Sequence, residues 1–202
     1  MYKRPWGYFL LTMLVVTGLA GRQHSETFSG KERRILIREL KNSSVQILQS
    51  VEPLNNHQLR FKDHQGSSIE RYMRDMVVTE AILWQKAQVA MKQNTQNGSI
   101  SQFNEQSLID ETYISNICST LLKENNNQPL HLPVSASIIK FKSQEDELLR
   151  YLRTSTNDVH HQFAETSVGR LTIYELMMLD ITCIQYYQQQ IEKIKNNGLF
   201  PN

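Results

Sequence analysis

The sequence lacks the short motifs that mark the most common catalytic sites. It has no GxGxxG or P-loop pattern, no nucleophile elbow, and no CxxC or HExxH metal motif. Strong charge of either sign is also missing. The net charge is only +2, and no basic run is longer than residues 31–34, which Glu32 interrupts. These absences leave no signature of a common enzyme class, and we expect no nucleic-acid partner.

Cysteine is scarce as well, because Cys118 and Cys183 are the only two in 202 residues. Two cysteines do not make the disulfide framework of a small secreted domain. They could pair, but both fall within helical patterns. We therefore expect two separate buried thiols that pack as small apolar side chains.

Long apolar runs are limited to residues 6–19 (WGYFLLTMLVVTGL), which follow a short basic region. Gly18 and Ala20 stand at positions −3 and −1 of a cut after Ala20, the layout of a secretory signal peptide. The run is shorter than the roughly 20 residues of a membrane-spanning helix. We predict a signal peptide at 1–20 and an exported bacterial chain, periplasmic or secreted. The alternative is an uncleaved N-terminal anchor, which would be the only attachment to a membrane.

The first half of the chain has two segments with the apolar spacing of bundle helices. After a polar leader at 21–30, the first helix is predicted over 31–51, ending before Pro53. The second begins near Ser67, whose spacing to Glu70 predicts a capping box. Its apolar stripe contains one acid, in the order Ile69, Met73, Met76, Glu80, Leu83, Ala87 and Met91.

The second half of the chain has two further long helices. A shorter helix at about 106–123 and a long loop come first, and the third long helix is predicted over 144–165. A turn at 167–170 follows. Thr172 and Glu175 predict a second capping box at the start of the fourth helix. Its stripe includes polar residues, in the order Ile173, Met177, Asp180, Ile184, Tyr187, Ile191 and Ile194.

These segments predict an all-α fold. No stretch of useful length has the alternating period of a strand. Four long helices, one extra short helix and long connections are typical of a four-helix bundle with a crossover connection. We assign residues 31–196 to one helical domain and 197–202 to a C-terminal tail.

Three stretches resemble the DinB-like (DinB/YfiT) superfamily of four-helix bundles. FKDHQGSSIERYMRDMVVTEAILW is similar to the entry of the family's second helix and matches it at Ser68-Ile69 and Glu80. SQEDELLRYLRTSTNDVHHQFAETSVGRLTIYELM resembles the third helix, the turn with its glycine (here Gly169) and the start of the fourth helix. CIQYYQQQIEKIK resembles the final helix and matches it at Gln190-Ile191. The resemblance spans most of residues 31–196.

The resemblance implies an up-down-down-up bundle and a metal site. Family members bind a divalent metal through three histidines, one on the second helix and two four residues apart on the fourth. Members with known activity are mostly metal-dependent thiol transferases or isomerases. In this sequence the three ligand positions hold Asp75, Cys183 and Tyr187, and Gly66 stands where a tryptophan usually precedes the Ser-Ile pair.

The main interpretation is a degenerate metal site in a non-catalytic protein, with a binding or structural role in the cell envelope. Cys183 would pack as a small apolar residue. The ring of Tyr187 would be buried, with its hydroxyl donating to a carboxylate. The candidate acceptors are Asp75, Glu80 and Asp180, and Arg71 or Arg74 would pair with an acid on the second helix. We predict no catalytic residue and no cofactor.

An enzyme is the first alternative. Asp75, Asp180 and Cys183, with one histidine, would hold a divalent metal (Zn, Ni or Mn) for a transferase or hydrolase. His160 and His161 on the predicted third helix are the candidate histidines, and at most one of them would face inward.

A binding protein is the second alternative. An unknown small molecule would occupy the cleft between the second and fourth long helices, lined by Asp75, Glu80 and Tyr187. As members of the family often dimerise, a homodimer could form through the glutamine-rich face of the last helix. That face comprises Gln185, Gln188, Gln189 and Gln190.

Overall fold

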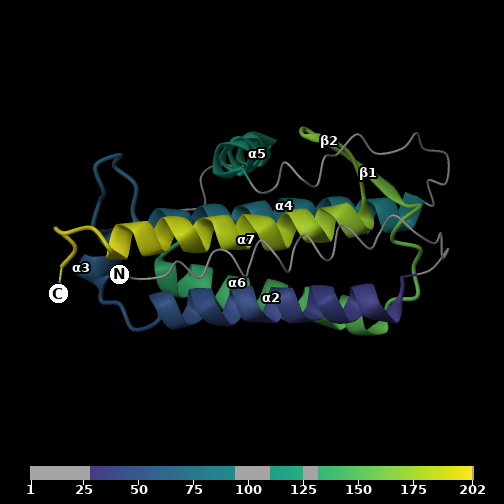
Figure 1. The fold of residues 1–202 in the computed structure, drawn as a ribbon, viewed down its shortest axis with the longest axis horizontal. Coiled ribbons are helices and arrows are strands. Elements are labelled where there is room, and N and C mark those ends of the chain that lie inside the picture. The colour runs from purple at the N-terminus through teal and green to yellow at the C-terminus, as the bar shows by residue number, and fades with distance from the viewer. Residues whose placement is uncertain (1–27, 94–109, 125–131, 202) are drawn as a thin grey trace.

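The computed structural model describes residues 28–93, 110–124 and 132–201, and four long helices form its bundle (Figure 1). The predicted signal peptide at 1–20 lies outside the described residues, as does most of the leader. The helices are α2 (Gly30–Val51), α4 (Ile69–Gln93), α6 (Val134–Thr154) and α7 (Ile173–Lys195). The all-α four-helix bundle is therefore confirmed.

The helix directions follow the expected up-down-down-up order. In Figure 1, α2 and α7 run in one direction, and α4 and α6 run in the other. Arg33 at the start of α2 donates to the carbonyl oxygens of Leu152 and Ser155 at the end of α6, over 2.5 and 2.7 Å. Ser50 and Glu192, near the ends of α2 and α7, are hydrogen-bonded. Packing joins α4 to α7, α7 to α2, α2 to α6 and α6 to α4, so two connections cross the bundle diagonally.

Helix α7 lies deepest in the molecule. It packs on α4 and α2, while α5 (Glu111–Glu124) covers a further side of it. A helix enclosed on several sides carries apolar residues around most of its circumference. This explains why its buried residues extend well beyond the predicted stripe and include Leu176, Met178, Leu179 and Ile181.

The helix starts agree with the capping predictions in part. Thr172 and Glu175 form the predicted capping box at α7. At α4 the predicted box is wrong: the hydroxyl of Ser68, rather than Ser67, accepts from the backbone N–H of Arg71 at 3.2 Å. Glu70 instead pairs with Arg60, an exposed residue of the short helix α3 (Asn56–Arg60). The helix therefore begins one residue later than the box would place it.

The predicted position of the third long helix is wrong by about ten residues at each end. Helix α6 starts directly after Pro133, because proline fits a helix start, where no backbone N–H is needed. It ends at Thr154, and Phe163–Thr166 forms a strand, β1, instead of a helix end. His160 and His161 consequently lie in the connection before β1, not on a helix.

A β-hairpin precedes α7, so the expectation of no strand is also wrong. Strand β1 pairs antiparallel with β2 (Gly169–Thr172), and Ala164 stands opposite Leu171. Both of these residues are buried, while their strand neighbours are more exposed. The chain reverses at the predicted turn, where Gly169 has a φ of 122° that other residues rarely adopt.

Two shorter helices flank the bundle. Helix α5 begins at Glu111, and residues 106–109 of its predicted span lie outside the described residues. It lies across α4 and α7 on the side away from α2 and α6 (Figure 1). In the tail, Phe200 packs edge-on against Phe61 beside α3, with ring centroids 5.6 Å apart. None of the described helices has the length and apolar character needed to cross a membrane.

Candidate functional site

The two cysteines meet between α5 and α7. Cys118 and Cys183 are both free and buried, and their sulfur atoms lie 3.0 Å apart. The expectation of two buried thiols that are not bonded to each other is confirmed, and the structure adds that the two sulfur atoms are in contact. Burial and the hydrogen bond with Cys118 raise the pKa of Cys183 well above its ordinary value, the hydrogen bond being the larger cause. Cys183 is therefore a neutral thiol in contact with a second thiol.

Tyr187, one helical turn after Cys183, points its hydroxyl at α4. The phenolic oxygen lies 3.1 Å from the hydroxyl oxygen of Thr79, and both residues are buried. Thr79 donates its own hydrogen to the backbone carbonyl of Asp75 at 2.9 Å. Since a hydroxyl has one hydrogen, Tyr187 must donate to Thr79. The predicted carboxylate acceptor is wrong, because a threonine takes that place.

Asp75 is directed toward its own helix. Its carboxylate pairs with Arg71 one turn earlier, at 3.5 Å, which confirms the predicted pairing on the second helix. Burial raises the pKa of Asp75, and the positive charges of Arg71 and Arg74 oppose that rise. Asp75, Cys183 and Tyr187 thus each have a different protein partner, supplied by α4, α5 and α4 respectively.

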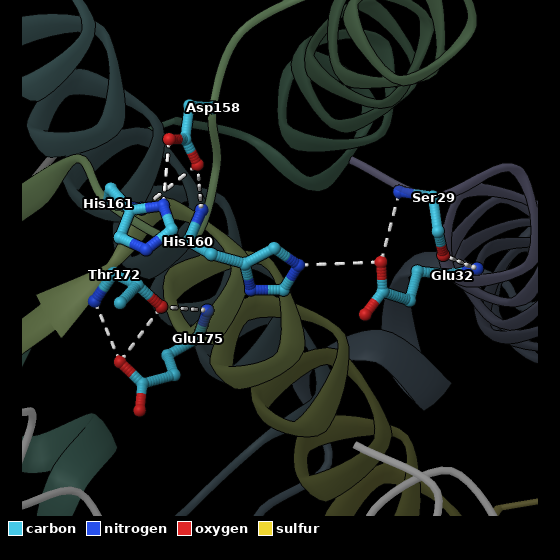
Figure 2. A network of polar contacts seen from close by, with 7 residues as sticks. All are labelled: Ser29, Glu32, Asp158, His160, His161, Thr172 and Glu175. Carbon is cyan, nitrogen blue, oxygen red and sulfur yellow. Dashed lines mark hydrogen bonds and ion pairs between the residues drawn. The ribbon is translucent and has the colours of Figure 1, made fainter. Parts of the chain in front are cut away.

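The histidines named for a remodelled metal site lie near the helix starts, as Figure 2 shows. The ring of His160 lies 5.0 Å from that of Tyr174 and 3.3 Å from the Glu32 carboxylate. Tyr174 is in the first turn of α7, and Cys183 follows about 14 Å further along the axis at the usual rise of a helix. In the described ranges, no group of three His, Cys, Asp or Glu side chains is arranged to hold a metal ion.

The contacts in Figure 2 cap the first turns of helices or hold the loop before β1 in shape. Glu32 closes a capping box with Ser29 at the start of α2, and its carboxylate also accepts from the ring of His160. Asp158 accepts from the backbone N–H groups of His160 and His161 and contacts the ring of His161 at 2.7 Å. These bonds join the connection before β1 to α2 and fix the loop's shape.

Two acids are buried where α4 faces α7. Glu80 is 2% exposed and Asp180 is 4% exposed. Both carboxylate oxygens of Glu80 and Oδ1 of Asp180 are buried without a hydrogen-bond partner in the described part of the chain. Burial raises the pKa of Asp180 to about 7. Burial, and then the charges of Asp180 and Glu145, raise the pKa of Glu80 well above its ordinary value.

An open groove lies beyond Tyr187, toward the end of α7. Its volume is about 520 Å³. Tyr72 and Tyr186 line it, and their ring centroids lie 6.3 and 5.4 Å from that of Tyr187. The other lining residues come from the loop before α4, from α5 and from α7: Asp63, His64, Gln65, Glu111, Thr112, Ser115, Gln190, Lys193 and Asn197. The predicted lining residues Asp75, Glu80 and Tyr187 are not among them.

The glutamines of α7 make contacts inside the molecule. Gln185 is buried and donates to Ser43 of α2 at 3.1 Å. Gln188 donates to Gln46 at 2.8 Å, and Gln190 donates to Glu111 at 3.0 Å. Most of this set joins neighbouring helices, so the description of it as one exposed face is wrong. The homodimer stays a prediction.

No protein-family model matches the sequence, and no curated protein matches it. Among solved structures, the chain is similar to YfiT from Bacillus subtilis, with a TM-score of 0.60 and 12% sequence identity. The match covers 86% of this chain and 91% of that one. The chain therefore has the four-helix bundle fold of YfiT. YfiT is described as a probable metal-dependent hydrolase with an unusual four-helix bundle topology.

The bundle places the predicted site residues on α4 and α7, as expected, and the structure adds partners that the sequence did not reveal. Thr79 is one turn from Asp75, so its position on the same face of α4 could have been recognised. Cys118 lies on a helix whose direction the sequence leaves open. The groove depends on the same helix, because Glu111, Thr112 and Ser115 form one of its sides.

Proposed function

We propose that this chain is an exported, non-catalytic binding protein whose DinB-like metal site has been lost. One observation carries the proposal. The three residues at the positions that the resemblance assigns to metal ligands all have partners within the protein. Asp75 pairs with Arg71, Cys183 contacts Cys118, and Tyr187 donates to Thr79. A metal would have to displace all three contacts, two of which are buried. The residues present therefore do not fit a three-ligand site.

Metal content tests this proposal. Protein purified without a histidine tag should contain no stoichiometric Zn, Ni or Mn, and its melting temperature should be the same with each metal and with chelator. A ligand present at one hundred times its dissociation constant would stabilise the fold by about 2.7 kcal/mol, which is easily measured. Stoichiometric metal that is lost in Asp75→Ala, but kept in the exposed control Asp146→Ala, would overturn the proposal. It would favour the hydrolase activity ascribed to YfiT.

The groove beyond Tyr187 is the proposed binding site. It offers two tyrosine rings, Tyr72 and Tyr186, beside the acids Asp63 and Glu111 and the base Lys193. Aromatic rings bind flat apolar groups, while carboxylates and an ammonium bind opposite charges. The site therefore fits a small zwitterion with an aromatic part. Lys193 already contacts Glu111, so a ligand carboxylate would compete for an existing partner.

Calorimetric titration with free phenylalanine, tyrosine and tryptophan tests the groove. Phenylpropionate and phenethylamine, which each lack one charge, are the matched probes. We expect the zwitterions to bind more tightly, and Lys193→Gln to weaken their binding about tenfold, the equivalent of one charge-assisted hydrogen bond. Lys123→Gln on the exposed side of α5 is the control. Equal binding of all probes, or an unchanged affinity in Lys193→Gln, would contradict this assignment.

Export has a separate test. The full chain, expressed in a bacterial host with an export system, should yield a mature protein whose first residue is Gly21. N-terminal sequencing of the exported fraction reads this directly. An intact N-terminus in the membrane fraction would instead support the uncleaved anchor.

A further inference from the structure

Three contacts between α5 and α7 form a regular series. Gln190 donates to Glu111, Tyr186 donates to Ser115, and the Cys183 and Cys118 sulfurs are in contact. As the residue number rises on α5 it falls on α7, so the contacts follow opposite orders on the two helices. The first two contacts are polar and partly exposed, and the third is buried. The thiols therefore lie at the inner end of the seam that holds α5 against the bundle.

The geometry of the thiols is close to that of a bonded pair. A disulfide has a sulfur–sulfur bond of about 2.05 Å, about 1 Å shorter than the 3.0 Å separation here. Small side-chain rotations or a slight approach of α5 would close that gap. No backbone rearrangement of the four-helix bundle is required, because α5 lies outside it and packs mainly on α4 and α7 among the helices.

We propose that Cys118 and Cys183 are a disulfide site, which covalently fixes α5 over the groove when a disulfide oxidant is present. The bond would close a loop between two positions that are 65 apart in the sequence. It would fix the side of the groove formed by Glu111, Thr112 and Ser115, the last of which is one turn from Cys118. The bond itself does not depend on what the groove binds.

The reaction is a thiol–disulfide exchange in two steps. The thiolate of one cysteine attacks a sulfur of a small disulfide, giving a mixed disulfide and releasing one small thiol. The thiolate of the second cysteine then attacks the bonded protein sulfur and releases the other small thiol. The protein loses two electrons and two hydrogen atoms, which the oxidant gains, and one sulfur–sulfur bond replaces another.

Access decides when the bond forms. Both thiols are buried, and the raised pKa of Cys183 leaves little thiolate in the closed state. The first exchange therefore takes place before α5 packs during folding, or while α5 is detached from α4 and α7. The bond should form readily on refolding with oxidant and slowly in the folded, reduced protein.

Peptide mapping tests the proposal directly. The reduced and denatured full chain is refolded with oxidised glutathione, alkylated in denaturant and cut with trypsin without reduction. The sequence gives one tryptic peptide for each cysteine, residues 93–123 and 171–193. We expect a single cross-linked pair of these peptides, two mass units lighter than their sum. Two free thiols, stable mixed disulfides with glutathione, or disulfide-linked dimers would each overturn the proposal.

Stability gives a second readout. Closing a loop of this length with a disulfide should make the melting temperature of the oxidised protein about 10 °C higher than that of the reduced protein. Reductant should reverse the rise. Cys118→Ser is the matched variant, since its melting temperature should not respond to reductant. If that variant fails to fold, the comparison of oxidised and reduced wild type still decides. An unchanged melting temperature in cross-linked wild type would refute the fixing of α5.

Acid quenching of expressing cells, followed by alkylation, shows whether the bond forms in the cell. A cross-link in the exported fraction supports both this site and the proposed export. Free thiols in a chain that keeps residues 1–20 and stays in the cytoplasmic fraction count against export alone, because the refolding experiment tests the cysteine pair without any compartment. Free thiols in a chain that begins at Gly21 count against the disulfide alone.

Discussion

The buried acids Glu80 and Asp180 predict that the fold loses stability as the pH rises. Burial raises the pKa of Asp180 from its ordinary 3.8 to about 7. The folded state thus binds a proton that the unfolded chain has released. The resulting stability is fully present below pH 4, and it is lost as the pH rises through about 7. Each pKa unit corresponds to about 1.4 kcal/mol, so the loss is at most about 4 kcal/mol.

Urea unfolding at several pH values between 4.5 and 8.5 measures this loss against Asp180→Asn. The variant keeps the shape of the side chain but does not titrate at that position. The free energy of unfolding of the wild type, less that of the variant, should fall by up to about 3 kcal/mol across this range, because part of the loss lies below pH 4.5. Subtraction also removes opposing contributions of acids such as Glu32 and Glu111, whose pKa values are lowered in the fold.

A constant difference between wild type and Asp180→Asn across the pH range would refute this reasoning. Glu165→Gln is the control, because that carboxylate is 79% exposed and should leave the profile unchanged. Glu80→Gln should show the same sign as Asp180→Asn, with its loss extending to higher pH, since the charge of Asp180 further raises the pKa of Glu80. Opposite slopes in the two variants would also contradict the burial argument.

Further predictions concern individual contacts. Tyr187→Phe should lower the free energy of unfolding by about 1 kcal/mol, and a double-mutant cycle with Thr79→Val should show coupling; additive losses would exclude their hydrogen bond. Thr172→Ala should cost about 1 kcal/mol in chemical unfolding because the capping box at α7 is lost, and an unchanged midpoint would contradict that role. Arg33→Met should cost about 1–3 kcal/mol, since its two bonds to backbone carbonyls join α2 to α6; a change below about 0.3 kcal/mol would show that water replaces them.

The helical seams were sufficient to predict the bundle. The stripe through Met177, Ile184 and Ile191 repeats over six turns, and no tertiary contact is needed to recognise such a period. The third long helix was misplaced because its N-terminal turns follow a proline-containing stretch read as loop, and because Val159 and Phe163 continue the helical spacing of Leu152 past the true end of the helix. The hairpin was missed because each strand has four residues, too few for an alternating pattern to be distinguished from a turn.

For the candidate site, the sequence predicted which helices carry the residues but not which partners those residues contact. Asp75, Cys183 and Tyr187 were placed on two helices by resemblance, and the neighbouring chain decided what each one touches. Thr79 accepts the hydrogen bond from the hydroxyl of Tyr187 because it projects from the same face of α4 as Asp75, one turn later. Cys118 reaches Cys183 because α5 crosses α4 and α7, and that crossing follows two long connections whose sequence carries no directional signal.

Most of the buried polar residues of α7 have hydrogen-bond partners on neighbouring helices. Gln185, Cys183 and Tyr187 find partners on α2, α5 and α4, so their polarity is compensated by protein groups. Within the described ranges, Asp180 differs from them in having a buried oxygen without a hydrogen-bond partner, and Glu80 on α4 has two such oxygens. Carboxyls that are protonated can donate to one another, whereas two ionised carboxylates can only repel. The neutral forms of this pair are therefore what allow α4 and α7 to pack closely, and ionisation should weaken the interface on which α5 rests.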